Sequence, residues 1–150
     1  MKALRHAPWL LLFALTSLPH ARAQTACPFF TQGTAATYLQ APVELSTDLN
    51  ANNEGSCTFT AHDASSTITL KLTATTAMQP ACPSGKPLTG IGTEATLCTR
   101  QTADTISARL RDLYLTIQLT TTGKPTKPFT TEQRQTIVQN AAEILAGNLF

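Results

Sequence analysis

Five segments of the chain alternate between apolar and polar side chains, the pattern of β-strands that bury one face. In residues 57–62, Cys57 and Phe59 fall on one side and the residues between them on the other. Short polar stretches at residues 63–66 and 111–112 are typical of hairpin turns, so neighbouring strands are predicted to pair antiparallel. The predicted strands are residues 57–62, 67–73, 94–100, 105–110 and 113–120.

Two further segments have the periodicity of helices. Residues 30–40 form a short helix, and Thr31 can cap its start. A longer helix begins with a capping box, in which Thr130 and Gln133 satisfy each other's free backbone N–H groups, and Gly147 is its candidate C-cap. The apolar stripe of this second helix consists of Ile137, Val138, Ala141, Ile144 and Leu145.

The stripe of the second helix needs an apolar surface to cover, and the inward face of the sheet is its natural partner. We therefore predict an α+β fold, with an antiparallel meander of about five to six strands packed against an N-terminal and a C-terminal helix. Residues 48–55 and 75–93 are predicted loops. The second is long and rich in proline and glycine, and such loops are usually functional or tethered.

The first 23 residues have the three parts of a signal peptide: the positive Lys2 and Arg5, an apolar run at residues 9–18, and a small-residue cleavage site ending at Ala23. The run is about ten residues long, well short of the roughly 20 that cross a bilayer. We therefore expect a single secreted or periplasmic domain, residues 24–150, without a membrane span.

Removal of the leader changes the charge of the chain. The whole sequence has 11 basic and 9 acidic residues and a net charge of +2. Without Lys2, Arg5 and Arg22 the net charge becomes about −1, and no basic run is left. This balance removes the electrostatic basis for a nucleic acid or an anionic membrane as partner.

The mature chain would keep all four cysteines, Cys27, Cys57, Cys82 and Cys98. An even number of cysteines in an exported protein predicts two disulfides, with three connectivities open. The absence of any Cys-x-x-Cys pair argues against a thioredoxin-like redox site or a zinc ribbon. Attachment of a lipid to Cys27 is an alternative, but residues 24–26 lack the aliphatic residue that such an anchor requires.

Few side chains suit catalysis. His62, the only histidine after the leader, is followed by Asp63 on a strand, where adjacent side chains point to opposite faces, so the two cannot form a triad. A zinc or copper site also lacks ligands, because the chain after the leader has one histidine and its cysteines are expected to be oxidised. We therefore expect no catalytic residue, metal or cofactor. The alternative is a small secreted hydrolase with paired carboxylates, drawn from Glu44, Asp48, Glu54 and Asp63.

Threonine is concentrated on the polar sides of the predicted strands. A sheet face rich in hydroxyl groups can bind a glycan or ice, although the high β-propensity of threonine explains the same pattern without a ligand. Tyr114 falls on this face and offers a ring on which a sugar can stack. The candidate binding residues are Thr58, Thr60, Thr69 and Tyr114.

Three short motifs resemble a group of bacterial domains. The Cys-Pro-Phe-Phe-Thr stretch at residues 27–31, Cys-Thr-Phe at 57–59 and Gly-Ile-Gly-Thr-Glu-Ala at 90–95 are similar to Cys-x-x-Leu-Thr, Cys-x-aromatic and Gly-[aliphatic]-Gly-Asp-Glu-Ala. These motifs occur in small secreted or lipid-anchored domains of unknown function related to the extracellular sensor domain of PknH-type receptor kinases. Thr93 departs from the usual acid.

The resemblance implies a disulfide between Cys27 and Cys57, which leaves Cys82 for Cys98. It implies no catalytic residues. We therefore expect a non-catalytic, monomeric exported domain that binds a partner protein or a small-molecule ligand through the 75–93 loop and the exposed sheet face. A structural or assembly subunit is a further alternative, and a long unpaired edge strand or an exposed apolar patch would be its sign.

Overall fold

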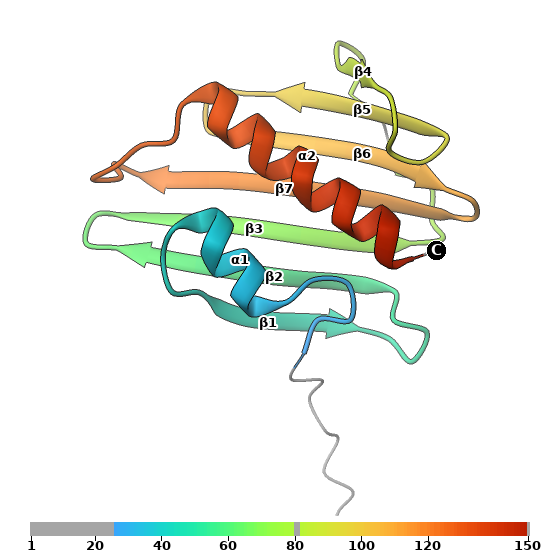
Figure 1. The fold of residues 1–150 in the computed structure, drawn as a ribbon, viewed down its shortest axis with the longest axis horizontal. Coiled ribbons are helices and arrows are strands. Elements are labelled where there is room, and N and C mark those ends of the chain that lie inside the picture. The colour runs from blue at the N-terminus through green and yellow to red at the C-terminus, as the bar shows by residue number, and fades with distance from the viewer. Residues whose placement is uncertain (1–25, 80–81, 150) are drawn as a thin grey trace, which may run out of the picture.

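Seven strands form one antiparallel sheet, and two helices lie against one of its faces (Figure 1). The computed structural model describes residues 26–79 and 82–149, so the predicted signal peptide lies outside the described residues. The elements are α1 (Gln32–Leu39), β1 (Glu44–Leu49), β2 (Gly55–Asp63), β3 (Ser66–Thr75), β4 (Lys86–Leu88), β5 (Glu94–Thr99), β6 (Ala103–Leu110), β7 (Leu113–Gly123) and α2 (Thr131–Asn148). The predicted α+β class is confirmed.

The strand order is β1-β2-β3-β7-β6-β5-β4, so the predicted single meander is wrong in one respect. The sheet consists of two meanders, β1 to β3 and β4 to β7, which meet where β3 pairs with β7. The chain leaves β3 in the middle of the sheet and starts the second meander at the far edge. The connection between them must therefore cross β7, β6 and β5.

The two strands that the sequence pattern missed are the edge strands. Residues 48–55 were predicted as a loop, but Asp48 and Leu49 belong to β1, which pairs with β2. Leu45, Thr47 and Leu49 alternate as in the other strands. The short β4 lies within the predicted 75–93 loop and pairs with β5.

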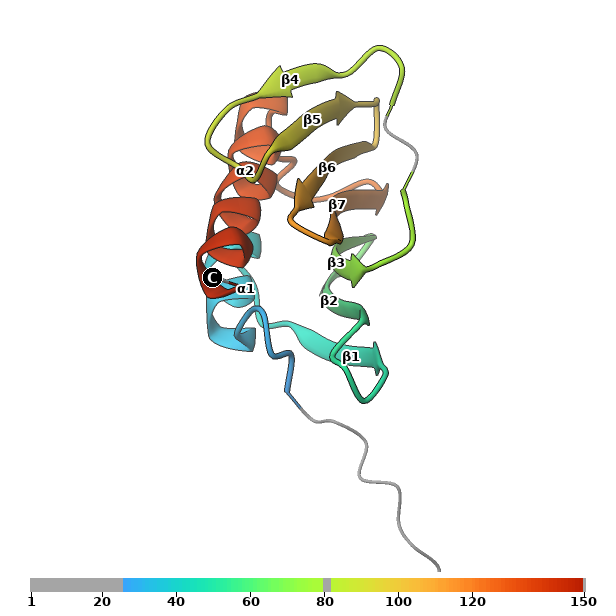
Figure 2. The same cartoon turned by 90° about the vertical axis from the view of Figure 1, so that its right-hand side faces the viewer.

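The hydrophobic core lies between the helices and one face of the sheet (Figure 2). The residues predicted to point inward do so, and α2 packs against β6 and β7 while α1 packs against β2. Phe30 stacks on Tyr38 and makes a T-shaped contact with Phe59, with the ring centroids 5.7 Å apart, so α1 is anchored by aromatic contacts. The largest fully buried apolar side chains are Phe59, Leu70, Leu72, Ile106, Leu115, Ile117, Leu119, Val138 and Leu145.

The helix termini follow the predicted caps. The Thr31 hydroxyl accepts a hydrogen bond from the Thr34 amide at 3.1 Å. The capping box of α2 is formed on both sides, by Thr130 with the Gln133 amide and by the Gln133 side chain with the Thr130 amide. Gly147 is not the C-cap, because α2 continues through it to Asn148.

Both disulfides join the predicted partners. Cys27 bonds to Cys57 and ties the segment before α1 to β2 on the helix side of the sheet. Cys82 bonds to Cys98 on the opposite side and ties the β3–β4 connection to β5. Because the sulfur of Cys27 is engaged in its disulfide, attachment of a lipid to this atom does not fit the structure.

An ion pair lies inside the apolar layer between α2 and the sheet. Asp104 points inward from β6 and is fully buried, and its Oδ2 accepts a hydrogen bond from Nε of Arg134 at 2.6 Å. Only 13% of the Arg134 side chain is exposed. The other carboxylate oxygen of Asp104 has no hydrogen-bond partner among the described residues. The buried charge of Asp104 therefore depends on Arg134.

Replacement of Arg134 by methionine should destabilise the fold by about 3–5 kcal/mol, because it leaves an uncompensated buried carboxylate. The double variant Asp104→Leu/Arg134→Met should recover most of this loss, because it removes both charges. Chemical denaturation measures both values, and Lys127→Met, on the exposed connector before α2, is the matched control. A double variant as unstable as Arg134→Met would contradict this account.

A second set of polar contacts fastens the β2–β3 turn to the connector before α2. Asp63 accepts hydrogen bonds from the Thr126 amide at 2.8 Å and the Ala64 amide at 2.6 Å. Ser65 and Lys124 exchange two more bonds. The Thr126 hydroxyl, followed by the Thr126 and Ala64 amides, lowers the pKa of the Asp63 carboxyl group below its ordinary value of 3.8.

A carboxyl group whose pKa is lowered on folding stabilises the protein above its unfolded pKa, and the stabilisation is lost as the pH falls through the folded pKa. Asp63→Ala should therefore lower Tm at neutral pH, and the difference from the parent protein should shrink as the pH falls below 3.8. Thermal unfolding at several pH values measures this. Asp112→Ala, at the β6–β7 turn, controls for loss of a surface charge. A Tm difference for Asp63→Ala that is constant with pH would refute the account.

Candidate functional site

The sheet face opposite the helices, on the right in Figure 2, carries mainly polar side chains. Its side chains form rows across the strands, because residues paired in register lie on the same face. One row runs from β3 to β5 and consists of Thr73, Thr116, Ser107 and Thr96. The neighbouring row consists of Lys71, Gln118, Thr105 and Cys98.

The described parts of the connection between β3 and β4 lie over this open face (Figure 2). We call residues 76–79 and 82–85 of this connection the strap. The bond from Cys82 to Cys98 holds the strap to β5. Gly85 allows the close approach, because a Cβ atom there would lie 2.1 Å from the Thr96 side chain and 3.2 Å from the Cys82 sulfur. A larger residue at position 85 would push the strap away from the sheet.

Three adjoining cavities lie between the strap and the sheet, with volumes of about 340, 190 and 80 Å³. The two larger ones share Gln118, and the smallest shares Ser107 with one and Gln79 with the other. We call these three adjoining cavities together the strap groove. Its polar lining consists of Lys71, Thr73, Gln79, Glu94, Thr96, Arg100, Thr105, Ser107, Arg109, Tyr114, Thr116 and Gln118.

Two cations of the strap groove have no ion pair with any described residue. Lys71 lines the 190 Å³ cavity and lies between Thr58 and Gln118 in register. Arg100 lines the 340 Å³ cavity, just past the end of β5. Neither of these two cavities is lined by an acid. The larger part of the groove therefore carries uncompensated positive charge in a hydroxyl and amide surrounding.

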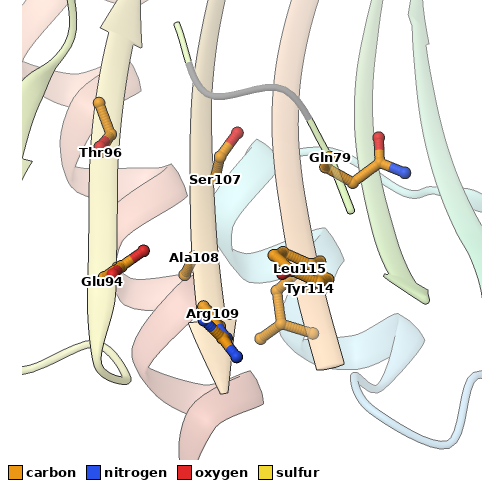
Figure 3. Close-up of a pocket in the computed structure, with 8 residues that line it drawn as sticks. All are labelled: Gln79, Glu94, Thr96, Ser107, Ala108, Arg109, Tyr114 and Leu115. Carbon is orange, nitrogen blue, oxygen red and sulfur yellow. The ribbon is translucent and has the colours of Figure 1, made fainter. Parts of the chain in front are cut away.

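The smallest cavity is lined by both a cation and an acid, Arg109 and Glu94. The Arg109 guanidinium group lies over the Tyr114 ring, with its central carbon 5.7 Å from the ring centroid, and its Nε donates to the Arg111 carbonyl. Glu94 lies opposite Arg109 in register. Figure 3 shows these side chains at one end of the cavity. Tyr114 is therefore a stacking platform on at most one face of its ring.

The residues that the sequence indicated for binding share the open face but are not brought together. Thr58, Thr60 and Thr69 point outward from β2 and β3 and are half-buried, and they line none of the cavities described here. Tyr114 alone lines part of the strap groove. Lys71 and Gln118 were missed. Their outward position follows from strand alternation, but their proximity depends on the pairing of β3 with β7.

None of the cavities described here is lined by two of the four acids of the hydrolase alternative. Glu44 and Asp48 are exposed on β1, with Glu44 4.0 Å from the His62 ring, and Asp63 is the last residue of β2. Glu54 lines a separate cavity of about 290 Å³ near the end of α2, with no second acid in its lining. Within the described residues, no cluster of three or more histidine, cysteine or acidic side chains is able to hold a metal ion.

Comparison of the chain with protein-family models, with curated proteins and with solved structures finds no match. The relationship to the PknH-type sensor domains therefore stays a prediction from short motifs. Among the described residues no helix has the length and apolar character that crossing a membrane requires.

Proposed function

We propose that this protein is an exported, non-catalytic binding domain whose strap groove holds a short glycan. The observation that supports the proposal is the groove itself: three adjoining cavities, fixed by a disulfide, with hydroxyl and amide side chains from four strands. Two disulfides are compatible with an oxidising compartment, as the predicted signal peptide implies. The domain acts as a monomer in this proposal.

The lining suits a sugar because each group can both donate and accept hydrogen bonds. Threonine and serine hydroxyls have one donor and two acceptor positions, and the amide of Gln118 adds two donors and an acceptor. These side chains project from paired strands, so their positions are fixed before a ligand arrives. Binding then loses less conformational entropy than it would on a mobile loop.

Two other uses of this surface fit the structure less well. An ice-binding face needs a flat array without charges, whereas Lys71 interrupts the threonine rows and the strap lies over them. An assembly subunit needs an apolar patch or an open edge strand, but in the described part of the chain only Met78 is a large, exposed apolar residue. The β1 edge carries Glu44 and Asp48, which protect an edge against pairing.

Removal of hydrogen-bonding groups from the groove should weaken glycan binding. We expect Gln118→Leu to reduce affinity by about tenfold, because sugar hydroxyls would lose a side chain that both donates and accepts hydrogen bonds. Thr116→Val should reduce it less. An array of neutral and acidic oligosaccharides identifies the ligands of the parent protein, and calorimetry then gives the affinity of each variant.

Thr58→Val is the matched control, because Thr58 has the same outward orientation on β2 but lies outside the groove. Its affinity should equal that of the parent protein. Equal losses in Thr58→Val and Thr116→Val would assign binding to the whole threonine face instead of the groove. Absence of binding by the parent protein to every glycan on the array would overturn the proposed function.

A further inference from the structure

The positive charge of the strap groove indicates the charge of the glycan that it binds. Resting on the proposed function, we infer that the glycan is an acidic oligosaccharide, one that contains uronic acid residues, and that Lys71 and Arg100 bind its carboxylates. Each of these cations lines one of the two larger cavities, and Gln118 is common to both cavities. The two charges therefore line neighbouring cavities on either side of Gln118.

The spacing of the two cations fits an oligosaccharide better than a single sugar. Lys71, Gln118, Thr105 and Cys98 follow one another across four neighbouring strands. At ~4.8 Å between strands, the backbone of Lys71 lies about 14 Å from that of Cys98. Arg100 lies two residues further along the chain. A ligand that reaches both charges is therefore longer than one sugar ring, and Gln118 and Thr105 meet its hydroxyl groups in between.

Lys71 and Arg100 line cavities without an acid, whereas the cavity of Arg109 is also lined by Glu94. Arg134 is paired with Asp104, and Arg109 faces Glu94 and covers Tyr114. Lys71 has only Thr58 and Gln118 beside it in register. An anion bound next to Lys71 meets no carboxylate in the lining of its cavity. A carboxylate supplied by the ligand would therefore provide the missing counter-charge.

The arrangement favours separate carboxylates over a dense polyanion. Highly sulfated chains and nucleic acids bind to clusters of basic residues, and their affinity comes from many neutralised charges. Here two cations stand apart in a domain whose net charge without the leader is about −1. Arg100 can hold a carboxylate with two parallel hydrogen bonds, and Lys71 acts as a point charge. One carboxylate at each end of a short saccharide matches this pattern.

Calorimetry with three probes tests the inference: the trisaccharide of galacturonic acid, its methyl ester, which has the same shape without charge, and a sulfated disaccharide without carboxylates. The acid should bind at least about tenfold more tightly than the ester, and this difference should shrink as salt is added. Lys71→Gln and Arg100→Gln should each remove most of the difference, while Lys71→Arg should retain it.

Lys86→Gln is the matched control, because Lys86 is exposed on β4 and does not line the strap groove. It should bind the acid as the parent protein does. Equal affinity for acid and ester, unchanged by Lys71→Gln, would overturn the charge inference and leave glycan binding intact. Tighter binding of the sulfated disaccharide would overturn the commitment to carboxylates. Failure of all three probes to bind would overturn this inference, and glycan binding itself would then be judged by the oligosaccharide array.

Discussion

The two helices of this protein cover only one face of a seven-stranded sheet, and the other features of the molecule follow from that constraint. Each strand must then bury one side and expose the other to water. The buried side collects the aliphatic and aromatic residues, and the exposed side collects threonine, which tolerates water and favours strands. Because the open face is polar, a segment that crosses it is held by something other than apolar packing, and the bond between Cys82 and Cys98 supplies that hold.

The topology places the strap groove at the junction of the two meanders. Lys71 on β3 and Gln118 on β7 are neighbours only because the last strand of one meander pairs with the last strand of the other. Because of the same strand order, the chain must cross β7, β6 and β5 to pass from β3 to β4. The crossing segment therefore starts at the junction of β3 with β7. The groove is therefore a product of strand order and not of a local motif.

The sequence predicts features that depend on neighbours along the chain. The five central strands, the caps at Thr31 and Thr130 and the inward faces need only periodicity and local hydrogen bonds. The edge strands β1 and β4 were missed because half-buried or very short strands lack a continuous apolar side. The pair of Asp104 with Arg134 was missed for another reason: a polar residue on the inward side of a strand has a partner only once α2 is placed.

A polar groove has a consequence for recognition. Water competes for every hydroxyl and amide in such a site, so each hydrogen bond to a ligand contributes only about 0.5–1.5 kcal/mol. The positions of these hydrogen-bonding groups alone would therefore give only weak selectivity between neutral sugars. An uncompensated cation adds an electrostatic term that acts over a longer range than a hydrogen bond and that salt screens. Lys71 on β3 and Arg100 just past the end of β5, which line cavities without an acid, would therefore contribute more to selectivity than the threonines that outnumber them.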